Sequence, residues 1–316
     1  MALTAAERAP AAPGGRGIGS LFAIVGVLGF SFKAILVKLG YAWDPSLDAV
    51  TLLTLRMIYS TPFFIVMAWW AGRGAHPTAA HDWRMLLALG FIGYYLSSLI
   101  DFVGLQYVTA ALERLTLYLY PTIVVLLSAW WFGKPITRRV VLALLLSYAG
   151  LFLAFAHDLR LGVDHAAIMY GGTLVFLSAV LYAIYLVLAG PLIERLGSSR
   201  FIAWAMLASA AFVFVQFALT RPASALDLPW SIHALALAMA VLSTVLPTWL
   251  IAEAIRRIGA NQSSLVGSLG PIFTIGLGAT ILDEPTNLLQ LVGAALVLSG
   301  VMLVSARPRP GAVERE

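Results

Sequence analysis

The sequence contains no cysteine and few charged residues. Only 11% of its 316 residues are charged, whereas 61% are hydrophobic. The absence of cysteine excludes disulfides, thiolate catalysis and metal sites with cysteine ligands. A soluble domain has about 25% charged residues, so this chain has too little charge to cover a water-soluble surface. The composition therefore predicts a membrane protein.

Features of nucleic-acid-binding proteins and enzymes are also scarce. The net charge is +5, but the basic residues stand singly or in pairs between apolar runs, with no basic stripe. Such charges are typical of membrane flanks, and no nucleic-acid partner is expected. The five histidines show no metal-ligand spacing, and no glycine-rich phosphate loop occurs. We therefore expect no metal, no cofactor and no catalytic residues, and a membrane-embedded enzyme is the less favoured class.

What the sequence does contain is ten apolar runs of about the length that crosses a bilayer. Runs of about 20 residues satisfy their backbone polar groups as helices, which predicts an all-α membrane protein with ten transmembrane helices. The first run has no small-residue cleavage site after it and is interpreted as an uncleaved helix. The runs are 19–39, 49–70, 84–106, 111–132, 139–156, 167–189, 199–220, 232–254, 262–282 and 287–305.

The positive charges are unequally divided between the two sides of this topology. Fourteen of the 20 lysines and arginines fall on the side of the termini, and four fall on the other side. By the positive-inside rule, both termini are cytoplasmic. The chain is thus expected in the inner membrane, with cytoplasmic tails at 1–18 and 306–316.

The two halves of the chain resemble each other. A shift of 150 residues places Pro121 on Pro271 and Gly150 on Gly300 without a gap. We interpret this as a duplication, with a first repeat at 19–156 and a second at 157–305. Each repeat has five spans, and an odd number requires the second repeat to be inverted. Inverted repeats allow a central site to open to either side in turn.

The sequence resembles the drug/metabolite transporter superfamily, in its ten-helix branch of two tandem EamA domains. The resemblance spans about 21–304 and implies a carrier of small metabolites without fixing the cargo. The family's loop acid after the ninth span is present as Glu284, whereas its first-half counterpart is Lys134. The pair Glu113-Arg114 replaces small or apolar residues. The residues and segments that carry the resemblance are Arg56, the helices of Pro121 and Pro271 with the loops 133–135 and 283–285, and the helices of Gly150 and Gly300.

Charged residues inside the spans are costly and usually face the bundle interior or a cavity. Lys33, Arg56, Asp101, Glu113 and Arg114 all fall in the outer third of the membrane by their distance from the helix starts. They predict an outward-facing polar vestibule that binds a charged or zwitterionic solute. Asp101 and Glu113 are also candidate proton carriers, because burial disfavours an ionised carboxylate.

A purely structural role for these charges is the alternative. Asp101 would then pair with Lys33 or Arg56, and Glu113 with Arg114 or Arg56, which would lock neighbouring helices together. A further acid, Glu253, lies beside two arginines near the cytoplasmic end of the eighth span, where a surface ion pair is expected.

Aromatic residues inside the spans form a second group of candidate substrate-binding residues. A tyrosine within a span offers a ring and a hydroxyl to a cavity, whereas helix packing is the plainer alternative. The candidates in this group are Tyr94, Tyr118, Tyr182 and Trp249.

Two prolines are candidate gating residues. Pro121 and Pro271 stand at matching positions of the fourth and ninth spans, where a proline removes a backbone donor and can kink a helix. The alternative is static close packing.

Together these features favour a secondary transporter that moves a small metabolite, amino-acid-like or otherwise charged, by alternating access. Proton coupling is an associated hypothesis. A flippase or exporter of lipids or amphipathic compounds is the alternative function. The expected partners are the solute and membrane lipids, with the chain acting as a monomer or a homodimer.

Overall fold

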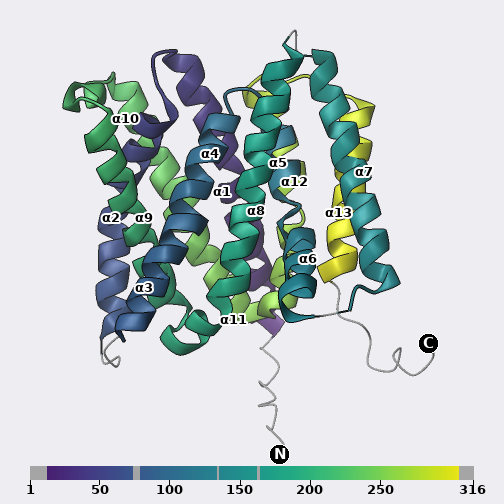
Figure 1. Ribbon diagram of the computed structural model, residues 1–316, viewed down its shortest axis with the longest axis horizontal. Helices are drawn as coiled ribbons and strands as arrows, with labels where there is room; N and C mark the ends of the chain where they lie inside the picture. The colour runs from purple at the N-terminus through teal and green to yellow at the C-terminus, as the bar shows by residue number, and fades with distance from the viewer. Residues whose placement is uncertain (1–12, 74–78, 134, 162–163, 306–316) are drawn as a thin grey trace, which may run out of the picture.

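The computed structural model describes residues 13–73, 79–133, 135–161 and 164–305, and this part of the chain is helical throughout, without strands (Figure 1). Its helices are α1 (Pro13–Trp43), α2 (Ala49–Gly72), α3 (Ala80–Leu89), η1 (Gly90–Leu96), α4 (Ser97–Gly104), α5 (Ala110–Leu117), α6 (Tyr120–Phe132), α7 (Arg138–Leu161), α8 (His165–Leu196), α9 (Ser198–Thr220), η2 (Ala223–Leu226), α10 (Trp230–Ala240), η3 (Val241–Val245), α11 (Leu246–Gly267), α12 (Gly270–Ile281) and α13 (Leu288–Ser305).

These segments form the ten expected spans. Eight stretches of the described residues are long and apolar enough to cross a membrane, and two shorter apolar helices, α12 and α13, complete the set. The third span joins α3, η1 and α4. The eighth joins α10, η3 and the first part of α11, and it ends at Gly259, whose φ of 83° breaks the helix. The prediction of an all-α protein with ten spans is confirmed.

The fourth and ninth spans are each broken into two helices, which hydropathy did not predict. The tenth span, α13, is one helix, whereas the fourth is broken between α5, which ends at Leu117, and α6, which begins at Tyr120. The ninth span is broken likewise, between the end of α11 at Gly267 and the start of α12 at Gly270. The two breaks coincide under the shift of 150 residues. The prolines explain both, since Pro121 and Pro271 each stand in the first turn of the second segment and have no N–H to continue the preceding helix.

A second irregularity also occurs in both halves. The third span contains the π-helical segment η1, and the eighth contains the π-helical segment η3. The shift of 150 residues maps η3 inside η1. π-Helical segments are rare in proteins, and those that occur often lie at functional sites. The duplication therefore preserved backbone defects as well as helices.

The packing of the helices shows the inverted repeat directly. Two pairs join equivalent helices of the two halves, α2 with α9 and α7 with α13. The contact of α1 with α11 has its equivalent in the contact of α8 with α4, because these are the first and third spans exchanged between halves. A pseudo-two-fold relation therefore connects the halves, and five spans each make it an inverted one.

Glycines bring α7 and α13 together. A Cβ atom added to Gly293 would lie 2.6 Å from the carbonyl oxygen of Gly150, and one added to Gly300 would meet Ser147 and the carbonyl of Ala143. Small residues permit such close backbone approach between membrane helices. Gly150 and Gly300 are equivalent positions, so the same device serves both halves.

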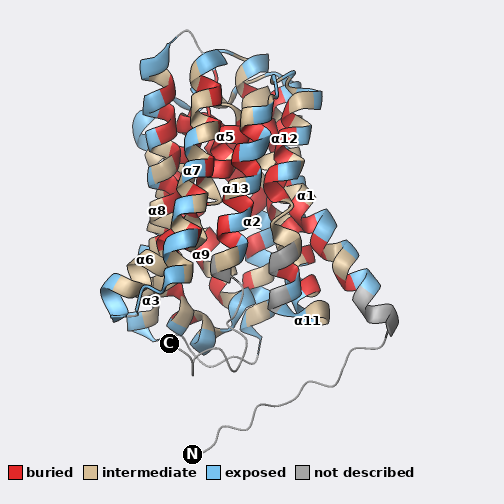
Figure 2. Ribbon diagram, turned by 90° about the vertical axis from the view of Figure 1, so that its right-hand side faces the viewer, coloured by how far each residue is buried: buried red, intermediate tan, exposed pale blue. Residues whose placement is uncertain are grey.

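The two ends of the bundle differ in packing. We call distal the end that carries the α1–α2 and α4–α5 connections, at the top of Figure 1, and proximal the end where α1 begins and α13 ends. Figure 2 shows the buried residues concentrated in the distal half, around α5 and α12. The charged candidate residues of the first half lie there.

Candidate functional site

A buried ion cluster links three helices in the distal half. The Lys33 ammonium on α1 lies 2.6 Å from Oδ2 of Asp101 on α4 and 2.8 Å from Oε1 of Glu113 on α5. The Lys33 side chain is 20% exposed, whereas Asp101 and Glu113 are 2% and 0% exposed. One cation thus pairs with two carboxylates and fixes the first, third and fourth spans to each other.

The partners of this cluster differ from those expected. Asp101 pairs with Lys33, as one alternative proposed, but Glu113 also pairs with Lys33 rather than with Arg114 or Arg56. The reason is helical geometry, because consecutive residues in a helix point about 100° apart. Glu113 and Arg114 therefore face different neighbours, and the predicted five-charge vestibule is divided.

Arg56 lies near this cluster without joining it. Its side chain on α2 is 6% exposed, and its guanidinium lies 5.5 Å from the ring centre of Phe102. Its Nε and Nη1 have no hydrogen-bond partner within the described part of the chain. A cation–π contact stabilises the charge in part, while Oδ1 of Asp101 is also buried without a partner. Buried polar atoms without a protein partner commonly bind a water molecule, and a carboxylate oxygen can instead carry a proton.

A second set of polar contacts closes the distal end around the start of α5. Glu284, in the α12–α13 loop, accepts the backbone N–H of Ala110 at 2.9 Å and pairs with Lys38 at 3.3 Å. Asp158, on α7, accepts hydrogen bonds from the N–H and the hydroxyl of Thr109, both at 2.9 Å. Two carboxylates thus bind the positive end of one helix, a favourable arrangement.

Sequence reasoning did not predict this network. Glu284 was recognised only as the loop acid of the family, and Asp158 was not singled out. The available signal was Thr109, a helix-capping residue type directly before an apolar run. Asp158, which accepts hydrogen bonds from Thr109, could not be inferred because it lies 49 residues away in the sequence.

The tyrosine candidates form one continuous chain of rings. Tyr120 packs edge-on against Tyr118 and Tyr182, with ring centres 6.3 and 5.4 Å apart. Tyr182 stacks on Tyr185 at 5.5 Å, and the hydroxyl of Tyr185 lies 2.9 Å from that of Tyr94 in η1. This row of tyrosine rings thus connects the break in the fourth span with the π segment of the third. Three of the four predicted aromatic residues are brought together here.

Trp249 lies elsewhere. Its side chain on α11 is 58% exposed and packs against Phe22 of α1, with ring centres 5.9 Å apart. The structure does not bring it into contact with the tyrosine chain. The nearby acid Glu253 pairs with Arg256 and Arg257, which confirms the predicted ion pair.

Across the described residues, no group of three or more histidine, aspartate or glutamate side chains is placed to hold a metal ion.

The fold and the buried polar sites define a multi-pass membrane protein made of two homologous halves. Residues 17–156 and 169–306 both match the EamA-like transporter family. The chain belongs to this family, which makes it a membrane transporter.

Relatives from bacteria and archaea agree with this assignment. The chain is 31% identical to "Uncharacterized transporter YcbK" of Bacillus subtilis, over 87% of this chain and 88% of that protein. It is 22% identical to an "Uncharacterized transporter" of Archaeoglobus fulgidus, over 86% and 92%. It is 25% identical to "Uncharacterized inner membrane transporter YicL" of Salmonella typhimurium, over 70% and 76%.

A solved structure shares the fold. It is described as "Crystal structure of protein", superposes with a TM-score of 0.58 and is 18% identical in sequence. The match covers 90% of this chain and 96% of the other.

Proposed function

We propose that the chain is a secondary transporter that moves a small charged or zwitterionic metabolite across the inner membrane by alternating access, with both termini in the cytoplasm. The observation that carries this proposal is the coincidence of the two helix breaks, at 118–119 and 268–269, under the exchange of the halves. Broken helices near the middle of inverted repeats commonly form substrate and ion sites. Pro121 and Pro271 at these breaks are the proposed gating residues.

The distal contacts give the proposed gate a physical form. Opening the distal end requires that α1 separate from α4 and α5, which breaks the contacts of Lys33 with Asp101 and Glu113. It also requires that Glu284 release the start of α5. Transport then consists of breaking this distal set while the equivalent proximal surfaces close.

Proton coupling is proposed for the ion cluster. Lys33 has one positive charge and faces two carboxylates, so the three groups together carry a net negative charge when both acids are ionised. Burying an unbalanced charge is costly, and a proton on Asp101 or Glu113 removes the imbalance. Arg56 is the proposed neighbour that tunes this site, because its charge interacts with Asp101.

The absence of native cysteine allows a direct test of alternating access. Val108 is 3% exposed at the distal end, and Val266 lies beside the second helix break. We expect single Val108→Cys and Val266→Cys variants to change reactivity toward an impermeant maleimide in opposite directions when transport is driven. Tyr107→Cys, at a position 39% exposed, is the control and should react at a constant rate. Parallel changes at both ends would contradict alternating access.

Neutral variants test the coupling. In proteoliposomes, we expect Asp101→Asn and Glu113→Gln to abolish substrate-driven proton flux while they retain exchange of solute for solute. The matched control is Glu253→Gln, which removes a surface carboxylate paired with Arg256 and Arg257. Proton flux at the level of the unaltered protein in both cluster variants would exclude them as carriers.

A flippase for amphipathic compounds is the second candidate, and one observation favours it. An apolar groove of about 190 Å³ lies between α5, α7 and α8, lined in part by Thr116, Phe155, Gly172 and Phe176. Such a groove could receive an acyl chain from the bilayer. Movement of a fluorescent phospholipid between leaflets of proteoliposomes, lost when Thr173→Phe narrows the groove from an exposed lining position, would support this function. An unchanged leaflet distribution would exclude it.

A further inference from the structure

The cations inside the bundle differ in what neutralises them. Among the described residues, Lys33 pairs with Asp101 and Glu113, and Lys38 pairs with Glu284. Arg114 has no carboxylate partner among the described residues, and its buried Nε has no hydrogen-bond partner either. Arg56 is also without a carboxylate but is only 6% exposed, whereas Arg114 is partly exposed. Of these four cations, Arg114 is therefore the one with a free charge and access to a ligand.

The surroundings of Arg114 leave room for its guanidinium at the second helix break. A Cβ atom at Gly270, the first residue of α12, would lie 3.1 Å from Nη2 and 3.5 Å from Nε of Arg114. Glu113, the preceding residue, points to Lys33 instead. The guanidinium of α5 thus lies beside the start of α12, where the two halves of the transporter meet.

Three tyrosines complete this neighbourhood. Tyr118 lies one helical turn after Arg114, and its hydroxyl lies 3.7 Å from the position of a Cβ atom at Gly267, next to the second break. The ring of Tyr120 packs against those of Tyr118 and Tyr182. Throughout the described segments, none of these hydroxyls has a hydrogen-bond partner, whereas those of Tyr94 and Tyr185 bind each other. All three rings are partly exposed. An unpaired guanidinium and three unpaired hydroxyls therefore lie together without an acceptor.

We propose that Arg114, Tyr118, Tyr120 and Tyr182 bind the carboxylate of an organic anion whose flat apolar body packs against the tyrosine rings. This inference rests on the proposed transport function and specifies its substrate class. A guanidinium donates two parallel hydrogen bonds to a carboxylate, and hydroxyls donate to the same oxygens. The rings offer apolar faces and edges to a planar group. One guanidinium fits one carboxylate, so a monocarboxylate is expected.

Matched probes separate charge from shape. Phenylacetate, phenylacetamide and phenethylamine share a benzyl group and carry an anionic, a neutral and a cationic head. Binding of each to the full-length protein in detergent is measured as a shift of the thermal unfolding temperature at millimolar concentration, since a ligand stabilises the state it binds. We expect stabilisation by phenylacetate alone.

Two variants and a control assign the effect to Arg114. We expect Arg114→Gln to weaken phenylacetate binding about tenfold or more, because a charge-assisted hydrogen bond is lost. Arg114→Lys should retain part of the affinity as a point charge without the paired geometry. Arg160→Gln removes an exposed arginine from α7 and should bind as the unaltered protein does.

The outcomes distinguish this inference from the transport function. Equal stabilisation by the amide or the amine, unchanged phenylacetate binding in Arg114→Gln, or no stabilisation by phenylacetate would each overturn the anion site. The opposite reactivity changes of Val108→Cys and Val266→Cys would still support a transporter in each of these cases. Their loss together with an intact anion preference would leave a binding site and overturn alternating access.

Discussion

The two halves share a backbone but differ in the chemistry at its breaks. The break in the first half is preceded by Glu113 and Arg114 and flanked by Tyr118 and Tyr120. The equivalent positions of the second half hold Ser263, Ser264, Ser268 and Gly270. One half therefore supplies charge and aromatic rings, and the other supplies small residues that leave room for them. The difference shows that an inverted repeat can be symmetric in shape while the charges at its helix breaks come from one repeat.

The largest expected effect comes from removing the cation of the first half. Lys33→Met leaves the buried carboxylates of Asp101 and Glu113 without their partner. We expect a loss of about 3–5 kcal/mol in the free energy of unfolding, measured by denaturation in detergent. Adding Asp101→Asn and Glu113→Gln to the same variant should restore much of the stability.

The position equivalent to Lys33 in the second half is Ala183, so Ser263→Ala, at the position equivalent to Glu113, is the comparison in that half. Ser263 is 4% exposed and stands where Glu113 stands in the first half. Its hydroxyl has no partner among the described residues, so we expect a change within about 1 kcal/mol. Equal losses in Lys33→Met and Ser263→Ala would contradict the assignment of the polar chemistry to one half.

A medium effect should be shared by both halves. Gly150→Ala and Gly300→Ala each place a Cβ against the backbone of the opposite helix at the α7–α13 contact. We expect both to destabilise the protein by about 1–3 kcal/mol through overpacking. Gly276→Ala is the control, because a Cβ there has nothing within 4 Å. A loss in one glycine variant only would show that this contact is asymmetric.

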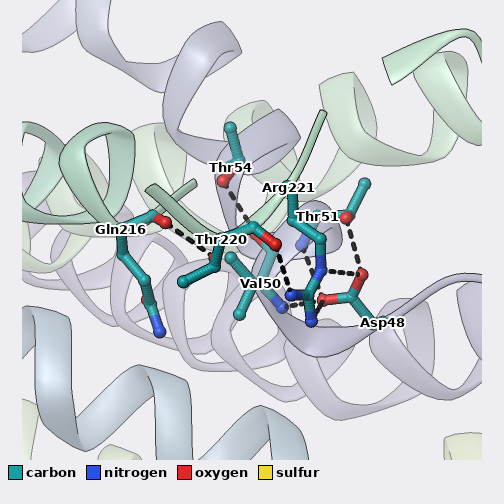
Figure 3. Close-up of polar contacts among 7 residues, drawn as sticks. All are labelled: Asp48, Val50, Thr51, Thr54, Gln216, Thr220 and Arg221. Atoms are coloured by element: carbon teal, nitrogen blue, oxygen red, sulfur yellow. Dashed lines mark hydrogen bonds and ion pairs between the residues drawn. The ribbon is translucent and has the colours of Figure 1, made fainter. Parts of the chain in front are cut away.

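A smaller effect concerns the distal tie between α2 and α9. Asp48 caps α2 by accepting the N–H groups of Val50 and Thr51, and Arg221 pairs with it at 3.0 and 3.2 Å (Figure 3). Asp48→Ala loses the cap and the pair, so we expect a loss of about 0.5–2 kcal/mol. Asp48→Asn keeps a capping side chain and should cost less, about 0.2–1 kcal/mol. Equal losses would assign the whole effect to the charge.

The same pair predicts a pH dependence. Burial by itself raises the pKa of the Asp48 carboxyl, but hydrogen bonds from Arg221 and Thr51 together with the charge of Arg221 lower it below its ordinary value of 3.8. A carboxyl with a lowered pKa in the folded state stabilises that state above its unfolded pKa. The contribution of Asp48 should therefore be full above about pH 5 and decline as the pH falls through the lowered pKa. Acid unfolding of Asp48→Asn beside the unaltered protein measures it.

The sequence predicted the spans well because a helix that crosses a bilayer needs a run of about 20 apolar residues, and hydropathy detects such runs directly. Pro121 and Pro271 predicted kinks in the fourth and ninth spans, but the complete interruption of both helices was missed, since hydropathy does not detect a proline in the first turn of a new helix. The π segments were missed for the same reason. In the third span, Gly93 of the π segment lies against the ring of Tyr185, which comes from another span.

The buried charges of the candidate site could be predicted from the sequence, whereas their pairings could not. Lys33, Asp101 and Glu113 could be recognised because charge inside a span is costly wherever it points. The direction of each side chain depends on the rotation of its helix against neighbours, which a single sequence does not specify. Glu113 and Arg114 show this best, since adjacent residues serve separate groups.

The contacts between equivalent helices bear on the ancestry of the protein. Because α2 packs on α9 and α7 on α13, each of these interfaces joins two versions of one helix. Two copies of a single five-helix chain, inserted in opposite orientations, would make such contacts across a two-fold axis. An ancestral antiparallel homodimer would thus have possessed these interfaces before its two subunits were fused. A fused chain can carry charges in one half alone, whereas a strict homodimer would carry them twice.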